Sequence, residues 1–190
     1  MNMWMPQFLV RIHELAPAQY SLPLGAALGV GGGLGAILGG TITGRAAVRN
    51  PRAFLSLPAL TMVIFAAALL LAVWTSSLVV VYAAVTVAAF TQFFLMGPFF
   101  AVVQRLAPLR GRAVATAFFF FILATIGIGV GPFYVGVAND LFGRAFGDAE
   151  GLRLALMTLP AISVIAAAIA FFGRKAIDLD AARLGGSAPG

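Results

Sequence analysis

The chain has 190 residues, of which 62% are hydrophobic and only 9% are charged, and its net charge is +6. Soluble domains carry about 25% charged residues and could not bury so much apolar surface, so this composition excludes a soluble domain and predicts an integral membrane protein. Nucleic-acid binding is not indicated, because the basic residues lie between long apolar runs rather than in one surface cluster.

The first fourteen residues are too few to cross a bilayer. Aromatic residues at their start and charged residues at their end predict the last turns of a helix that reaches the membrane surface. We therefore expect an upstream segment to be missing. His13 and Glu14 do not complete an HExxH zinc motif, because Pro17 stands where the second histidine would be.

Four charge-free runs follow, and the second, residues 53–104, is too long for a single crossing of about 20 residues. The polar stretch Thr75-Ser76-Ser77 after Trp74 divides this run in two. The sequence therefore predicts an all-α bundle of five transmembrane helices. Their expected positions are about 21–43, 55–74, 78–103, 113–138 and 154–173.

The basic residues also predict the topology. Arginines without neighbouring acids occupy the segments 44–52 and 104–112, and Arg174 and Lys175 follow the last span. The opposite segments mix acidic and basic residues. By the positive-inside rule the first set is cytoplasmic, and so is the C-terminus. The tail 176–190 ends in small residues and is expected to be disordered.

Ionisable residues are absent from all five predicted spans. Such residues inside a membrane usually mark proton or substrate sites, so this segment is not expected to hold a proton relay. A hydrolase would need a nucleophile with a base or a metal. The chain also has no cysteine, so disulfides, thiol catalysis and thiolate metal sites are excluded, and neither a metal nor a cofactor is expected.

Two of the predicted spans carry glycines at four-residue spacing. The first has two adjoining stripes: Gly25, Gly29 and Gly33, and Gly31, Gly35 and Gly39. The fourth contains Gly127, Gly129, Gly131, Pro132 and Gly136. Small residues at this spacing let helix backbones approach closely, and Pro132 can bend its helix. Tight packing and flexible gating both remain open as interpretations, and they are compatible.

The span 78–103 is the most polar of the five. It contains Tyr82, Thr86 and Gln92, and a kink is expected at Pro98. A lipid-facing amide would be poorly satisfied, so Gln92 is expected to point into the bundle or into a cavity. A helix–helix hydrogen bond and a substrate contact remain open for it. Spans 55–74 and 154–173 are mostly aliphatic and are expected to face lipid.

Four stretches together carry a family resemblance. They are Trp4-x-Pro6-x-Phe8-Leu9-x-Arg11-x-His13, Gly39-Gly40-Thr41-Ile42-Thr43-Gly44-Arg45-x-x-x-Arg49, Gly97-Pro98 with Gln104-Arg105-Leu106-x-Pro108-x-x-x-Arg112-Ala113-x-Ala115, and Gly127-x-x-x-Gly131-Pro132-x-x-x-Gly136-x-x-x-Asp140. Because of these stretches, residues 1–175 resemble the C-terminal half of a major facilitator superfamily transporter, which comprises spans seven to twelve. The spinster-like branch is the most similar.

The resemblance implies a six-helix half-domain whose first helix is truncated. It implies a secondary active or facilitative transporter that works by alternating access in a bacterial inner membrane. The expected partners are the lipid bilayer, an N-terminal half (upstream in the same chain, or a second subunit) and a small-molecule or amphiphilic substrate held near the midplane. The odd number of spans suggests a fragment, although a half-size protein that pairs with another half stays open.

The resemblance also implies roles for particular residues. The two glycine-rich spans would cross helices of the other half through Gly25, Gly29, Gly33, Gly127, Gly131, Pro132 and Gly136. The residues bordering the cavity would be Tyr82, Thr86 and Gln92. A cytoplasmic loop motif would comprise Gly40, Gly44, Arg45 and Arg49. The family has Asp where this chain has Gly44, so the resemblance implies the arginine contacts without the charge relay that the Asp supports.

Two other classes of protein are compatible with parts of the sequence. The first is a non-transporting membrane subunit or scaffold that uses the same small-residue packing to hold a partner. Solute uptake by the reconstituted assembly separates it from a transporter. The second is an intramembrane enzyme, which the lack of catalytic residue types in the spans argues against.

Overall fold

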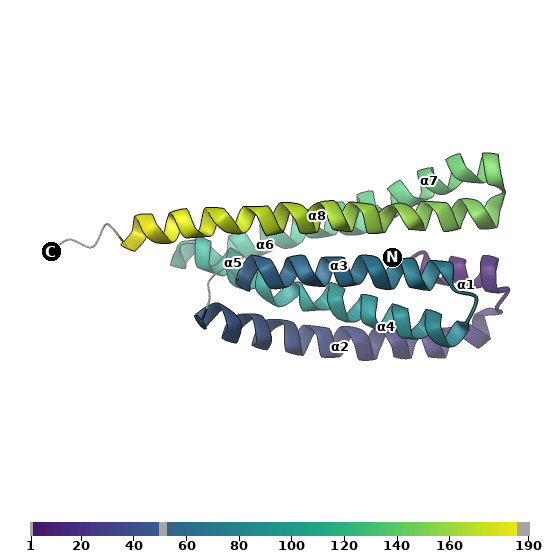
Figure 1. Cartoon of the computed structure of the whole chain (residues 1–190), viewed down its shortest axis with the longest axis horizontal. Helices are drawn as coiled ribbons and strands as arrows, with labels where there is room; N and C mark the ends of the chain where they lie inside the picture. The colour runs from purple at the N-terminus through teal and green to yellow at the C-terminus, as the bar shows by residue number, and fades with distance from the viewer. Residues whose placement is uncertain (1, 50–52, 186–190) are drawn as a thin grey trace.

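The computed structural model describes residues 2–49 and 53–185 and shows a bundle of long helices joined by short turns (Figure 1). The elements are α1 (Met5–His13), α2 (Pro17–Arg49), α3 (Ala53–Trp74), α4 (Leu78–Phe94), α5 (Met96–Leu106), the 3₁₀ turn η1 (Leu109–Gly111), α6 (Arg112–Leu123), the π-helix η2 (Ala124–Val130), α7 (Gly131–Phe146) and α8 (Asp148–Gly185). The described residues contain no strand.

Five stretches of these residues are long and apolar enough to cross a membrane. They are Pro17–Ala46, Leu55–Trp74, Leu78–Gln104, Arg112–Phe146 and Asp148–Phe172. The predicted all-helical membrane bundle with five spans is therefore confirmed. The predicted polar turn also forms between α3 and α4, where the Ser77 backbone N–H donates to Thr75 Oγ1 at 3.2 Å.

Two helices continue further than the sequence analysis expected. Helix α2 extends to Arg49, so Arg45 and Arg49 lie on its last turns and not in a loop, because only helix-compatible residues occupy positions 45–49. Helix α8 extends to Gly185, although the chain was expected to be unstructured from residue 176. Its last turns are rich in Ala, Leu and Arg, which favour helix. Residues 186–190 of the expected tail lie outside the described residues.

The span formed by α4 and α5 is interrupted at Leu95, three residues before the kink expected at Pro98. Proline has no backbone N–H, and its ring crowds the carbonyl four residues earlier. That carbonyl belongs to Phe94, the last residue of α4. The proline thus ends the helix one turn before its own position.

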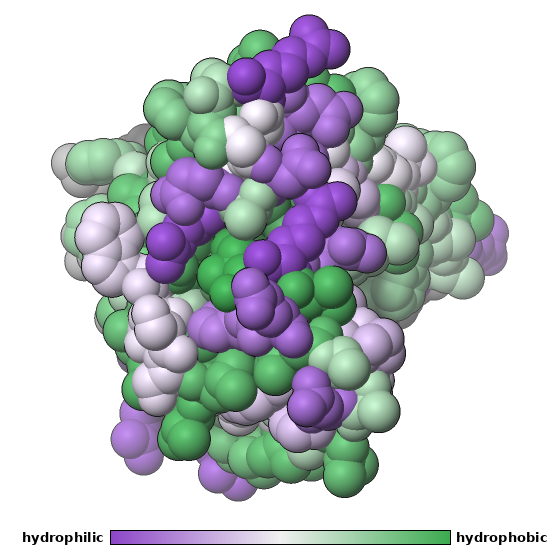
Figure 2. All heavy atoms as spheres, turned by 90° about the vertical axis from the view of Figure 1, so that its right-hand side faces the viewer, coloured by the Kyte–Doolittle hydropathy of each residue, from purple (hydrophilic) through white to green (hydrophobic). Residues whose placement is uncertain are grey.

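The main interfaces pair α2 with α4, α3 with α8, α7 with α8, and α3 with α4. The short helix α1 lies among them at the end of the bundle where the α1–α2, α3–α4 and α7–α8 turns gather (Figure 1). Its side chains Met5, Phe8 and Leu9 are fully buried. They form one hydrophobic core with residues of α2, α3, α4, α7 and α8. Figure 2 views this end directly and shows hydrophilic residues across it, with hydrophobic residues around the sides.

Helices α2 and α4 touch through their backbones. A Cβ atom added to Gly31, Gly35 or Gly39 would overlap a carbonyl oxygen of α4. The three oxygens are those of Thr86, Phe90 and Phe94, which are also spaced by four residues. The second glycine stripe of the first span is therefore an internal contact of this chain. Such approach of backbones is the usual role of small residues between membrane helices.

Arg153 joins the start of α8 to the end of α3. Its Nε donates to the Val73 carbonyl at 2.9 Å, and its Nη2 donates to the Trp74 carbonyl at 3.3 Å. Helix C-termini leave carbonyls without internal donors, so the guanidinium satisfies two of them. Glu150 lies 3.7 Å from Arg153 Nη1 and partly balances its charge.

His13 ends α1 outside the five spans, and protonation of this residue should weaken the fold. Burial, and then the positive charge of Arg153, lower the pKa of His13 from its ordinary 6.5. A lowered histidine pKa means that the folded state prefers the neutral ring, so its contribution is complete above pH 6.5 and declines as the pH falls. We expect the thermal midpoint to drop between about pH 8 and about pH 5.5. His13→Asn should reduce this drop, and an equal drop in the variant would contradict the assignment.

Candidate functional site

A cavity of about 360 Å³ opens among the segment before α1, α4, α8 and the η2–α7 junction. It brings together residues from distant parts of the chain. Its lining consists of Asn2, Met3, Trp4, Gln92, Gly127, Ile128, Gly131, Pro132, Val135 and Leu159. We call it the Gln92 cavity.

The Gln92 cavity has polar side chains from two parts of the chain. The Gln92 side chain is exposed in this chain and offers both a donor and an acceptor. Two neighbouring atoms, Trp4 Nε1 and Asn2 Oδ1, are shielded from solvent and have no hydrogen-bond partner among the described residues. A buried indole N–H normally finds a partner, so Trp4 leaves an unsatisfied donor beside the cavity.

The backbone at the η2–α7 junction adds a further acceptor. In the π-helix the Gly131 N–H donates to the Ile126 carbonyl, five residues earlier. The next donor in this pattern would be residue 132, but proline has no N–H. The Gly127 carbonyl therefore receives no bond of this kind, and Gly127 lines the cavity. Single π-helical turns inside α-helices are frequent at functional sites, where they free backbone groups.

The residues that line the Gln92 cavity include no ionisable side chain. A charged group bound there would lose hydration without gaining a counter-ion from this chain, which is costly. An uncharged hydrogen-bonding group of a bound molecule can pair with Gln92, and its apolar surface can pack against the apolar lining residues. The site can thus hold an uncharged part of a polar or amphiphilic molecule, and it offers no nucleophile or base for a reaction.

The structure brings together only some of the residues that the sequence singled out. Gln92, Gly127, Gly131 and Pro132 line the cavity. Gly136 lies beside it, and an added Cβ there would be 3.6 Å from the Trp4 ring.

Tyr82 and Thr86 lie elsewhere. Tyr82 packs against the hydrophobic core, and Thr86 Oγ1 donates to the Tyr82 carbonyl at 2.8 Å. Sequence reasoning missed Asn2, and it placed Trp4 in the last turns of a helix that reaches the membrane surface. The indole N–H of Trp4, which needs a hydrogen-bond partner, was the feature that could have pointed to a polar site.

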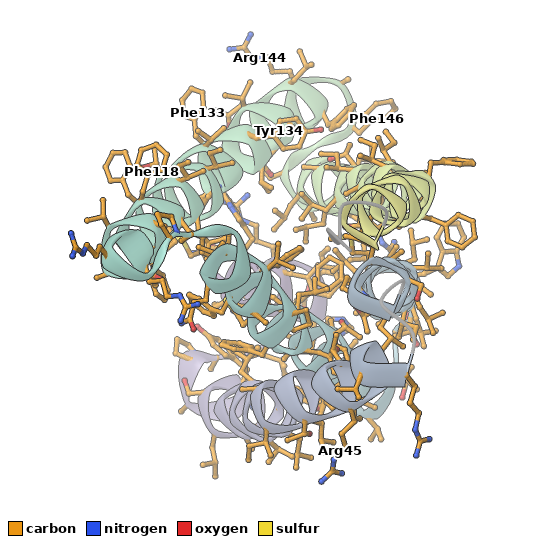
Figure 3. The ribbon with its side chains drawn as sticks, turned by 90° about the vertical axis from the view of Figure 1, so that its left-hand side faces the viewer. Arg45, Phe118, Phe133, Tyr134, Arg144 and Phe146 are labelled. Carbon is orange, nitrogen blue, oxygen red and sulfur yellow. The ribbon has the colours of Figure 1, made fainter. Side chains whose placement is uncertain are left out.

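Two other surfaces lack a partner within the described chain. Nothing lies within 4 Å of a Cβ added to Gly25, Gly29 or Gly33 on α2. None of the residues of α6 or η2 is buried. Figure 3 shows Phe118 and Phe133 pointing away from the neighbouring helices, and they are 63% and 73% exposed.

The four residues of the expected loop motif occupy the last turns of α2. Gly44, Arg45 and Arg49 are exposed, and Arg45 points away from the bundle (Figure 3). Gly40 makes a backbone contact, because a Cβ on Gly97 of α5 would lie 2.7 Å from the Gly40 Cα. Gly40 thus packs α2 against α5.

These features describe a multi-pass helical membrane protein with a neutral, hydrogen-bonding cavity. The chain is 34% identical over 169 residues to a protein named "MFS-type efflux pump" from Mycolicibacterium smegmatis. The similarity covers 88% of this chain and 38% of that protein, so the chain spans about two fifths of its relative. The likeness is thus to part of a protein whose name places it among major facilitator superfamily pumps. No family model matches the chain, and no solved structure matches it.

Proposed function

We propose that the chain is the C-terminal half-domain of a secondary transporter that works by alternating access. Its partner would be an N-terminal half, either upstream in the same chain or in a second subunit. The observation that carries this proposal is the Gln92 cavity, which is open and uncharged and borders η2, none of whose residues is buried. A site between two halves near the midplane is the arrangement that such transporters use.

We further propose that the substrate is a small amphiphilic molecule and that transport is outward. The neutral cavity supports the first point, and the name of the Mycolicibacterium relative supports the second. The spans expected from the sequence (21–43, 55–74, 78–103, 113–138 and 154–173) contain no Asp, Glu, His, Lys or Arg. A coupling acid within the membrane would therefore come from the other half. The topology that follows from the arginine-rich segments has a cytoplasmic C-terminus in a bacterial inner membrane. We also propose that the chain belongs to the spinster-like branch of the superfamily.

Gln92→Leu should lower transport of the preferred substrate by about tenfold, because a hydrogen bond contributes about 0.5–1.5 kcal/mol and 1.4 kcal/mol is a factor of ten. The measurement is dye efflux from cells or vesicles that contain the complete assembly, with equal amounts of each variant in the membrane. Gln104→Leu is the matched control, since Gln104 is exposed and does not line the cavity.

The same assay distinguishes the transporter from a membrane scaffold. We expect Gln104→Leu to transport as the unchanged protein does. Equal transport by both variants would remove Gln92 from the substrate path. An assembly that holds its partner but moves no amphiphilic solute in reconstituted vesicles would favour the scaffold.

A further inference from the structure

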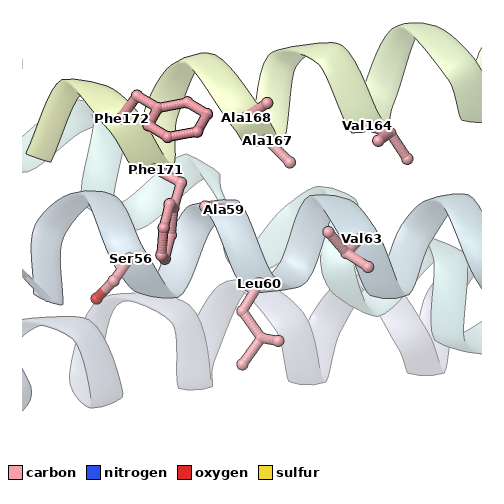
Figure 4. A pocket seen from close by; sticks show the side chains of 9 residues that line it. All are labelled: Ser56, Ala59, Leu60, Val63, Val164, Ala167, Ala168, Phe171 and Phe172. Atoms are coloured by element: carbon pink, nitrogen blue, oxygen red, sulfur yellow. The ribbon is translucent and has the colours of Figure 1, made fainter.

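A second groove runs between α3 and α8 on the side of the bundle, near the beginning of α3 (Figure 4). Its volume is about 390 Å³. Its walls are formed by Ala59, Leu60 and Val63 on α3 and by Val164, Ala167 and Ala168 on α8. Phe171 and Phe172 stand at one end, and Ser56 supplies the only polar side chain. We call it the α3–α8 groove.

The groove exists because the two helices pack closely at their other ends. There Leu69 and Val73 of α3, and Leu152 and Leu156 of α8, are fully buried in the hydrophobic core. Arg153 also fastens the start of α8 to the last carbonyls of α3. Towards residue 56 three alanines stand among the larger lining residues, and a space stays open between the helices.

The dimensions of the groove fit one lipid leaflet. The seven steps from Ser56 to Val63 rise about 10 Å along a helix at 1.5 Å per residue. One leaflet contributes about half of the ~30 Å hydrocarbon core. The groove therefore covers most of the depth that a lipid acyl chain occupies in one leaflet. In a membrane, an open apolar groove on the side of a bundle is filled by such a chain.

Basic residues that follow the groove on α8 would favour lipids with an anionic headgroup. In the sequence Arg174 and Lys175 come within three residues of Phe172, so they lie on the turn of α8 that follows the groove. Basic residues at the end of a membrane helix attract anionic lipids.

A second apolar groove in the same chain provides a control for the α3–α8 groove. A groove of similar volume, also about 390 Å³, runs between α3 and α4 near their connecting turn. Ala83 and Leu71 line it, and the adjacent turn carries the uncharged residues Thr75–Ser77. This α3–α4 groove has apolar walls. The cation at this end of α3 is Arg153, which is hydrogen-bonded to the Val73 and Trp74 carbonyls and lies 3.7 Å from Glu150, so its charge is already partly balanced.

We propose that the α3–α8 groove is a binding site for an anionic phospholipid. One acyl chain lies along Ala59, Ala167 and Ala168, and the phosphate lies at the level of Arg174 and Lys175. The α3–α4 groove contacts bulk lipid without preference for charge. This proposal does not depend on the transport function.

The test uses the full chain, purified and placed in vesicles that contain phosphatidylglycerol or phosphatidylcholine with a photoreactive acyl chain. Cross-linked peptides are identified by mass spectrometry. We expect phosphatidylglycerol to label residues 56–63 and 164–172 several-fold more than phosphatidylcholine does. Ala168→Phe should remove this labelling, because the ring fills the groove. Ala83→Phe, which fills the α3–α4 groove, should leave it unchanged.

The double variant Arg174→Gln with Lys175→Gln tests the charge separately and leaves the groove itself intact. It should abolish the preference for phosphatidylglycerol while labelling by both lipids persists. Helicity measured by circular dichroism confirms that each variant is folded. The proposal is overturned if the two lipids label the α3–α8 groove equally in the unchanged chain. It is also overturned if the double variant keeps the full preference.

Discussion

Gly35→Ala is expected to lower the free energy of unfolding by about 1–3 kcal/mol, the usual cost of overfilling a well-packed interface. The added Cβ would overlap the Phe90 carbonyl oxygen of α4, and neither backbone can move without disturbing the contacts one turn away at Gly31 and Gly39. The change is the smallest that chemistry allows. Its effect therefore reports the closeness of the α2 and α4 backbones and little else.

Gly33→Ala is the matched control for this experiment. It lies on the same helix two residues earlier, and its added Cβ would meet no atom within 4 Å. Alanine is favoured over glycine in a helix by about 1 kcal/mol, so this variant should be as stable as the unchanged chain or more so. Stability is measured by denaturant titration of helicity in mixed micelles. Equal stability of the two variants would mean that α2 and α4 are further apart.

Gly33→Leu is expected to reduce transport by the complete assembly by about tenfold to a hundredfold. We place this residue where the chain meets the other half, and overfilling such a contact costs about 1–3 kcal/mol, with each 1.4 kcal/mol a factor of ten. The fold of the chain itself should be unaffected, because the position is open within it. Loss of transport without loss of stability is the signature of a contact between halves.

The control for Gly33→Leu is Ala161→Leu on α8, which makes a comparable increase in size at an exposed position of a span expected to face lipid. Efflux from cells with equal membrane levels of each variant is the measurement. Unchanged efflux by Gly33→Leu would count against a contact at this stripe. A similar loss in Ala161→Leu would show that any bulky addition to the spans is harmful.

Composition and hydropathy were enough to predict the five spans, because a membrane helix is defined by its own local sequence. They could not show which of the two glycine stripes of α2 is internal. Gly33 and Gly35 are two residues apart, which places them about 200° apart around the helix. Both stripes satisfy the same spacing rule, and only the position of α4 distinguishes them.

The candidate site was predictable in part. Gln92 stood out because an amide is unusual within an apolar span, and the structure places it in a cavity with Gly131 and Pro132. The π-helix that precedes α7 was not predictable, since it depends on a shift of hydrogen-bond pairing that no single residue type specifies. Asn2 and Trp4 reach the cavity through the packing of α1, which is a tertiary effect.

The most direct test of the central claim is the environment of residue 33 in the working assembly. The chain contains no cysteine, so Gly33→Cys can carry the only spin label on this chain. Ile165→Cys, at a 61% exposed position of α8, provides a lipid-facing reference. Accessibility of each label to oxygen, which concentrates in lipid, is measured by electron paramagnetic resonance. A second half that covers the stripe predicts much lower oxygen accessibility at residue 33 than at residue 165. Equal, high accessibility at both positions would show that α2 faces lipid, and would contradict a transporter built from this half and a partner.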